Sequence, residues 1–195
     1  MKVKICGITN LDDALHAIKA GADALGFVFY PESPRYISPE SARAIIAKLP
    51  PFIEKVALFV NESTDTIRQI CLETGCTLAQ IHFDVIDDFY DSLHFPSLKV
   101  IRAQTKEDVM RYANDYRLID AYCDAFGGSG KRLNIEWFDG IDCSKIILAG
   151  GLNPDNVASL KPYGFYGVDV SSGVEISKGK KDFQKVVNFI RSAKS

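Results

Sequence analysis

The sequence predicts an α/β fold with a parallel sheet, and three observations lead to this prediction. Strand-like runs alternate with helix-like segments along the whole 195-residue chain. Several strand candidates, such as Ala24–Phe29 and Ile146–Ala149, are almost entirely apolar, as expected when both faces of a strand are buried. The candidates number eight, which favours a (β/α)8 TIM barrel over an open doubly wound sheet.

The strand candidates are short and rich in β-branched, aromatic and aliphatic residues. Helices between them imply right-handed crossovers between parallel neighbours. We expect a single domain over residues 1–195, because the sequence contains no internal repeat, low-complexity stretch or linker. In chain order the predicted strands are Val3–Cys6, Ala24–Phe29, Val56–Val60, Leu78–Ile81, Leu98–Ala103, Leu118–Tyr122, Ile146–Ala149 and Gly167–Val170.

Most predicted helices follow a recognisable start signal. Asn10 with Asp13, and Thr105 with Asp108, have the spacing of a capping box. Ser38 precedes a proline, which is the favoured order for an N-cap and the first helical residue. The helical pattern is weakest in the segment Asp87–Leu93. The predicted helices are Leu11–Ala20, Glu40–Leu49, Asp87–Leu93, Val109–Tyr116, Asp155–Leu160 and Lys181–Ala193.

Composition and charge exclude several classes of function. A net charge of -2 argues against a nucleic acid held by bulk charge. No apolar run approaches the roughly 18 residues of a membrane span, and charged residues interrupt the N-terminus where a signal peptide would be apolar. Five cysteines without a CxxC pair indicate reduced thiols in the cytoplasm. The three scattered histidines give little support to a metal site.

In a barrel of this kind, function lies where the strands end and the following loops begin. The first strand ends at Cys6, which is either a small buried thiol or a base or nucleophile. The sixth strand reaches Asp120 as its first polar residue, which could be an acid, a base or a helix cap. Sequence alone assigns no cationic neighbour that would favour a thiolate at Cys6.

The ends of the last strands are typical of a phosphate site. Gly150 and Gly151 follow the seventh strand, and Ser171 and Ser172 follow the eighth. Backbone amides and hydroxyls at these two positions are the recurring phosphate site of such barrels. The glycine-rich stretch 127–131 lacks the spacing of a P-loop and is either a loop that closes over substrate or an ordinary surface loop.

Arg35 lies in the loop after the second strand, between a proline and a tyrosine. Such a guanidinium could grip a carboxylate through two hydrogen bonds, although a solvated surface arginine is the simpler interpretation of this loop alone.

Taken together, these strand ends resemble the phosphoribosylanthranilate isomerase family. The matching stretches cover residues 2 to about 182, nearly the whole chain. "KICGIT" and "DVSSGVE", near opposite ends, are specific in combination. The other matching stretches are "DDA", "GADALGFVFYPESPRYIS", "VALFVNE", "LID" leading to "FGGSGK", "LAGGLNPDNV" and "GKKD".

The resemblance implies an Amadori rearrangement of N-(5-phosphoribosyl)anthranilate to 1-(2-carboxyphenylamino)-1-deoxyribulose 5-phosphate, in L-tryptophan biosynthesis. It implies Cys6 as general base, Asp120 as general acid, Arg35 as the group that binds the anthranilate carboxylate and Asp169 near the sugar. It also implies a monomer or homodimer that needs no cofactor. The phosphate would be bound around Gly128, Ser129, Gly150, Gly151, Ser171 and Ser172.

Two other functions stay open at this point. One is a different sugar-phosphate isomerase on the same barrel, which would be indifferent to the loss of Arg35. The other is a phosphate-binding barrel without catalytic activity, which would tolerate a change at Cys6. The presence of two candidate proton-transfer side chains at strand ends argues against the second.

Overall fold

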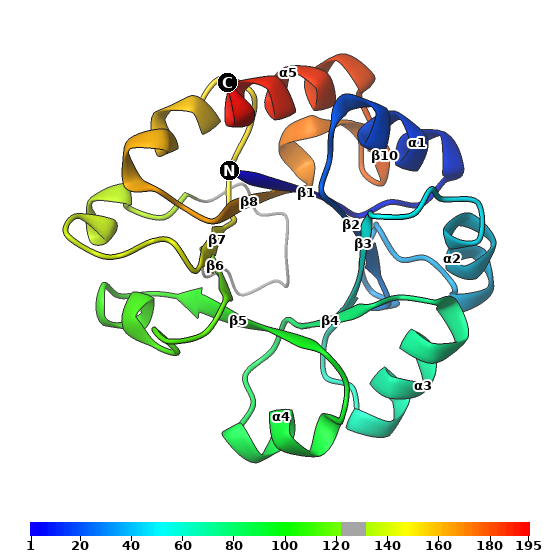
Figure 1. Cartoon of the computed structure of the whole chain (residues 1–195). Coiled ribbons are helices and arrows are strands. Elements are labelled where there is room, and N and C mark those ends of the chain that lie inside the picture. Colours follow the sequence, from blue (N-terminus) through cyan, green and yellow to red (C-terminus); the bar gives the residue numbers. More distant parts are fainter. Residues whose placement is uncertain (122–131) are drawn as a thin grey trace.

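The computed structural model describes residues 1–121 and 132–195, in which eight parallel strands close into a barrel (Figure 1). The strands pair in sequence order, and β8 (Gly167–Val170) closes the ring against β1 (Lys2–Cys6). The predicted eight-stranded barrel is confirmed. The other strands are β2 (Ala24–Val28), β3 (Glu54–Phe59), β4 (Leu78–Ile81), β5 (Ser97–Ala103), β6 (Arg117–Ala121) and β7 (Ile146–Leu148).

Full α-helices cover the first half of the barrel and its closure, and buried aliphatic and aromatic side chains fill the space between helices and strands. The Asn10 side chain accepts a hydrogen bond from the Asp13 amide at 2.8 Å, which confirms the first predicted cap. The helix after β3 was not among the predicted ones. The helices are α1 (Leu11–Ala20), α2 (Pro39–Ile46), α3 (Thr64–Thr74), α4 (Asp87–Leu93) and α5 (Phe183–Lys194).

Short 3-10 turns take the place of helices beside β5, β6 and β7. They are η1 (Glu107–Met110), η2 (Ile135–Phe138) and η3 (Val157–Tyr163). The predicted helix Val109–Tyr116 is wrong, because only the short turn η1 forms in this region, and η1 begins without a side-chain cap. The predicted helix Asp155–Leu160 is also wrong, because η3 forms there instead, and Pro162 within η3 supplies no backbone N–H.

The failure of helix Val109–Tyr116 has a visible cause in the buried Arg117 at the start of β6. Its guanidinium donates hydrogen bonds to the carbonyl oxygens of Val109, Ala113 and Asp115, at 3.1, 3.4 and 3.3 Å. These carbonyls therefore find a partner outside the regular helical pattern, and the segment folds as irregular turns around one side chain.

A small antiparallel hairpin that the sequence did not predict follows β8. The turn η4 (Ser172–Val174) leads into β9 (Glu175–Ser177), which pairs with β10 (Lys180–Lys181). The predicted last helix began at Lys181, but α5 begins at Phe183, after Asp182 caps it by accepting from the Lys185 amide. The hairpin therefore stands between the end of the barrel and its last helix.

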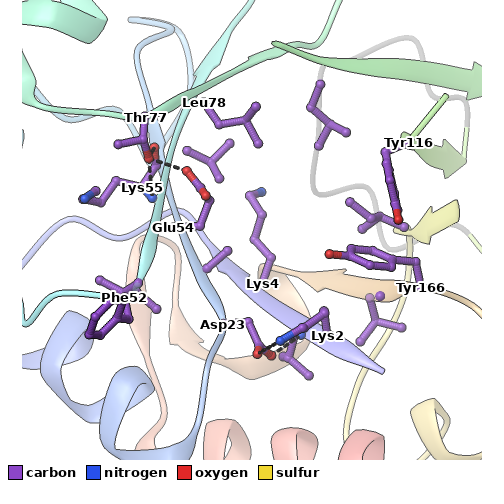
Figure 2. A pocket seen from close by; sticks show the side chains of 18 of the residues that line it. Lys2, Lys4, Asp23, Phe52, Glu54, Lys55, Thr77, Leu78, Tyr116 and Tyr166 are labelled. Carbon is purple, nitrogen blue, oxygen red and sulfur yellow. Dashed lines mark hydrogen bonds and ion pairs between the residues drawn. The ribbon is translucent and has the colours of Figure 1, made fainter. Parts of the chain in front are cut away.

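A cavity of about 650 Å³ opens at the amino-terminal ends of the strands (Figure 2). Lys2 and Asp23 form an ion pair of 3.0 Å on its wall, and Glu54 accepts a hydrogen bond from the Thr77 hydroxyl. This is the end of the barrel opposite to the predicted functional residues. Within residues 1–121 and 132–195, no helix combines the length and the apolar character that crossing a bilayer requires.

Candidate active site

The predicted residues from four separate parts of the chain meet at one cavity of about 80 Å³ at the carboxyl ends of the strands. Cys6 comes from β1, Arg35 from the loop after β2, Asp120 from β6, and Asp169 and Ser171 from the end of β8. This cavity is much smaller than the one at the opposite end. Its titratable side chains, and not its volume, mark it as the candidate active site.

Lys4 supplies the cation near Cys6 that sequence alone did not assign. Lys4 and Cys6 are two residues apart on β1, so their side chains lie on the same face of the strand. The Lys4 ammonium is buried and forms an ion pair of 2.9 Å with Asp169, its partner in register on β8. Burial raises the pKa of the Cys6 thiol above its ordinary value, and the positive charge of Lys4 opposes that rise. Lys4 therefore favours the thiolate.

The environment of Asp120 favours the protonated acid. Burial and the negative charge of Asp169 raise the pKa of Asp120 to about 6. Its Oδ1 accepts a hydrogen bond from the Ala121 amide at 2.8 Å. The loop after β7 packs against the same oxygen, because a Cβ atom at Gly150 would lie 2.8 Å from it. A glycine at that position therefore lets the backbone approach the acid closely.

His82, after β4, is a site residue that the sequence reasoning missed. Its Nε2 lies 3.6 Å from Asp120 Oδ2, and its Nδ1 lies 3.2 Å from the Gln80 amide nitrogen. Burial and the nearby charges of Lys4 and Arg102 lower the pKa of His82 to about 4, so the ring is neutral near pH 7. Its place directly after a strand was the available signal in the sequence.

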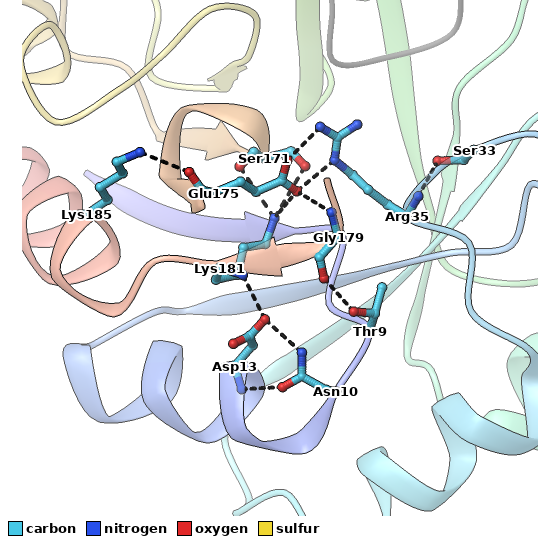
Figure 3. A network of polar contacts seen from close by, with 10 residues as sticks. All are labelled: Thr9, Asn10, Asp13, Ser33, Arg35, Ser171, Glu175, Gly179, Lys181 and Lys185. Atoms are coloured by element: carbon cyan, nitrogen blue, oxygen red, sulfur yellow. Dashed lines mark hydrogen bonds and ion pairs between the residues drawn. The ribbon is translucent and has the colours of Figure 1, made fainter. Parts of the chain in front are cut away.

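Arg35 is buried, and part of its guanidinium already binds a carboxylate of the protein itself. Its Nε and Nη2 donate hydrogen bonds of 2.8 Å each to Glu175 of β9 (Figure 3). One bidentate edge of the guanidinium is thus already occupied, and as far as residues 1–121 and 132–195 are concerned, the end bearing Nη1 is left for a ligand. A Cβ at Gly7, whose φ is +77°, would lie 2.7 Å from Arg35 Cδ, so this glycine makes room for the arginine.

The predicted phosphate residues are only partly assembled around the described cavity. Ser171 lines it, while Gly150 and Gly151 follow β7 with φ angles of +89° and +62°, and Ser172 opens η4. Gly128 and Ser129 lie outside the described residues. Across the described ranges, no group of three or more His, Cys, Asp or Glu side chains has the arrangement of a metal site.

Comparison with known proteins identifies the family. The model of the N-(5'-phosphoribosyl)anthranilate isomerase family matches residues 3–192. The chain belongs to this family. The N-(5'-phosphoribosyl)anthranilate isomerase of Sulfurovum sp. (strain NBC37-1) is 66% identical over 195 residues, with both chains fully covered. That of Thermotoga neapolitana is 45% identical over 205 residues, covering 100% of this chain and 98% of the relative.

Solved structures of the isomerase family show the same fold. The phosphoribosylanthranilate isomerase of Thermotoga maritima has a TM-score of 0.86 at 38% identity, covering 100% of this chain and 98% of its own. Another solved isomerase structure, with a TM-score of 0.85 and 38% identity, contains reduced 1-(o-carboxyphenylamino)-1-deoxyribulose 5-phosphate. The chain is a phosphoribosylanthranilate isomerase of tryptophan biosynthesis, so the expected reaction is confirmed over the two open alternatives.

Proposed function

We propose that Cys6 is the general base and Asp120 the general acid of this isomerase. The observation that carries the assignment is that both side chains line one buried cavity in different electrostatic surroundings. Asp120 faces the negative Asp169 and holds its proton to about pH 6, whereas Cys6 adjoins the positive Lys4. Two neighbouring groups whose nearest charges act in opposite directions, one favouring the protonated acid and the other favouring the thiolate, suit acid–base catalysis.

These roles account for both proton transfers. Asp120 gives its proton to the furanose oxygen, the ring opens, and the amine nitrogen holds the positive charge as an iminium. The iminium acidifies the hydrogen on the adjacent carbon, and the Cys6 thiolate removes that proton. The resulting enolamine becomes the aminoketose. One proton leaves Asp120 and one arrives at Cys6, so the net change in the substrate is an isomerisation.

The remaining roles concern binding. We assign Arg35 to the anthranilate carboxylate, because a guanidinium at the cavity wall complements a planar carboxylate. Ser171 and Ser172, together with Gly128, Ser129, Gly150 and Gly151, are assigned to the phosphate. Asp169, held by Lys4 at 2.9 Å, is assigned to the sugar. The positive backbone angles at Gly150 and Gly151 support an anion site, since such turns expose amide groups.

Replacement of either proton-transfer residue should abolish most of the activity. The fluorescence of phosphoribosylanthranilate is followed as it disappears, with wild type, Cys6→Ser and Asp120→Asn. We expect kcat to fall about 100-fold or more in each variant, as is typical for the loss of a general acid or base. Cys71→Ala, which changes a buried thiol of α3 outside the cavity, is the control and should keep wild-type kcat. Wild-type turnover by either test variant would refute the assignment.

We also propose that residues 1–195 act as one domain, as a monomer or a homodimer, in the cytoplasm. Free cysteines at the four described positions support a reducing compartment. One solved structure of the family concerns monomers generated from the dimeric Thermotoga maritima isomerase, which supports proposing either assembly for this chain.

A further inference from the structure

A single buried carboxylate, that of Glu175, gathers two cations near the active-site cavity (Figure 3). Its Oε1 accepts from Arg35 Nε at 2.8 Å, from Lys181 Nζ at 3.0 Å and from the Gly179 amide at 3.3 Å. Its Oε2 accepts from Arg35 Nη2 at 2.8 Å. The side chains of Glu175 and Lys181 are only 5% and 2% exposed. A buried carboxylate with four donors has little freedom to move.

The hairpin that carries Glu175 is itself fastened to the beginning of the chain. The Thr9 hydroxyl donates to the Gly179 carbonyl at 2.5 Å, and the Lys181 amide donates to Asp13 Oδ2 at 2.8 Å. Thr9 follows β1, and Asp13 belongs to α1. The position of the Glu175 carboxylate is therefore fixed relative to β1, which carries Cys6.

Arg35 lines the cavity, whereas Glu175 stands behind it and does not. Two parallel hydrogen bonds to one carboxylate fix both the position and the rotation of a planar guanidinium. The edge formed by Nε and Nη2 faces Glu175, so the end with Nη1 is the part that a ligand can meet. Without Glu175 the side chain would have several rotamers, and binding would have to restrict them.

We propose that Glu175 is a positioning residue that orients Arg35 and thereby sets the preference of the isomerase for an N-aryl substrate with an ortho carboxylate. This inference rests on the proposed role of Arg35. A buried ion pair by itself is weak evidence for a contribution to stability, because desolvation offsets much of the attraction. Selective recognition of a carboxylate gives the cluster a function that a hydrophobic contact at the same place would not supply.

The test compares two substrates that differ only in the carboxylate: phosphoribosylanthranilate and N-(5-phosphoribosyl)aniline. The quantity measured is kcat/KM for phosphoribosylanthranilate divided by kcat/KM for N-(5-phosphoribosyl)aniline. It is determined for wild type, Glu175→Gln and Arg35→Ala. We expect the ratio to fall about tenfold or more in both variants, the typical size of a lost hydrogen bond to a charged group. The loss in Glu175→Gln should lie mainly in KM for the carboxylated substrate.

The substrate ratio separates positioning from a structural role, because misfolding lowers the rates of both substrates equally. An unchanged ratio in Glu175→Gln, with a reduced ratio in Arg35→Ala, would overturn the inference and leave the role of Arg35 intact. An unchanged ratio in Arg35→Ala would overturn the proposed role of Arg35 and the inference with it.

Glu175→Gln leaves Arg35 and Lys181 as two buried cations without a carboxylate, and this variant could fail to fold. The double variant Glu175→Gln/Lys181→Met removes one charge of each sign and restores the balance of the cluster. It should fold and show the same lowered ratio, since both substrates carry the phosphate and any effect on phosphate binding cancels. A folded double variant with the wild-type ratio would refute the inference.

Discussion

At the scale of single residues, the proposed acid and base of the cavity are mostly in the protonation states opposite to those that the reaction needs. Burial and Asp169 raise the pKa of Asp120 to about 6, and burial raises the pKa of the Cys6 thiol above its ordinary value despite Lys4. At neutral pH most free enzyme therefore carries a thiol at Cys6 and a carboxylate at Asp120. The reactive form, with the thiolate and the protonated acid, is a minor population.

This order predicts which residue controls each limb of the pH profile of kcat/KM. Below pH 6 Asp120 is protonated, so activity rises with pH as the thiolate forms. From pH 6 up to the pKa of Cys6, the loss of acid balances the gain of thiolate and gives a plateau, and above it activity falls. We expect the acid limb near pH 6 to belong to Asp120 and the alkaline limb to Cys6.

The Lys4→Met variant distinguishes the two limbs. Without the ammonium the pKa of Cys6 rises further, so the alkaline limb should move to higher pH by more than the acid limb does. The profile is measured from steady-state rates between pH 5 and an alkaline limit set by protein stability. An alkaline limb that stays in place in Lys4→Met would contradict the influence of Lys4 on the thiol.

At the scale of elements, the connection from β5 to β6 is organised by one buried arginine and not by a helix. The spacing of Thr105 and Asp108 predicted the cap of an α-helix. In the structure Asp108 Oδ2 accepts from the amides of Gln104 and Thr105 at 2.9 and 3.0 Å, but no α-helix follows. The rest of the connection depends on Arg117, whose contacts with the preceding carbonyls are tertiary. No local pattern could have predicted them, and the helix prediction failed there.

Arg117→Met should therefore destabilise the fold without changing the chemistry. It leaves three carbonyl oxygens without their charged donor, and we expect unfolding to become easier by about 2–4 kcal/mol. Urea denaturation measures this change. Lys145→Met is the matched control, because Lys145 donates to the Asn114 carbonyl of the same connection at 2.8 Å but is exposed. A similar, small effect in both variants would rule out the special role of Arg117.

At the scale of the whole molecule, the active site costs stability near neutral pH. Asp120 has a pKa of about 6 in the folded protein and an ordinary value of 3.8. The folded state therefore binds this proton more tightly than the unfolded state does. Below pH 3.8 that preference contributes fully to stability, and it is lost as the pH rises through 6. The ionised Asp120 carboxylate thus destabilises the folded barrel near neutral pH.

Asp120→Asn should remove this destabilisation while it inactivates the enzyme. The amide keeps an oxygen for the Ala121 amide but carries no charge at any pH. We expect the variant to be more stable than wild type by up to about 3 kcal/mol at pH 7–8, with no gain below pH 4. Thermal unfolding at several pH values measures the difference. A gain that is independent of pH would show that ionisation is not its cause.

The contrast between predicted and unpredicted features depends on the range of the interactions. Cys6, Asp120 and Asp169 could be placed because strand patterns and strand ends are local properties, and parallel strands in a barrel bring their ends together. Lys4 and Glu175 carried no such signal, since each matters through a partner distant in sequence. Glu175 illustrates this, because its partner Arg35 lies 140 residues away.

The hairpin of β9 and β10 separates recognition from reaction within one pocket. The proton-transfer side chains belong to barrel strands, whereas Glu175, which binds Arg35, lies on the hairpin between β8 and α5. Exchanging residues 174–182 together with the loop that bears Arg35 would therefore be a way to re-engineer the enzyme for amines other than anthranilate. The same catalytic strands would then serve a different class of amine without being redesigned.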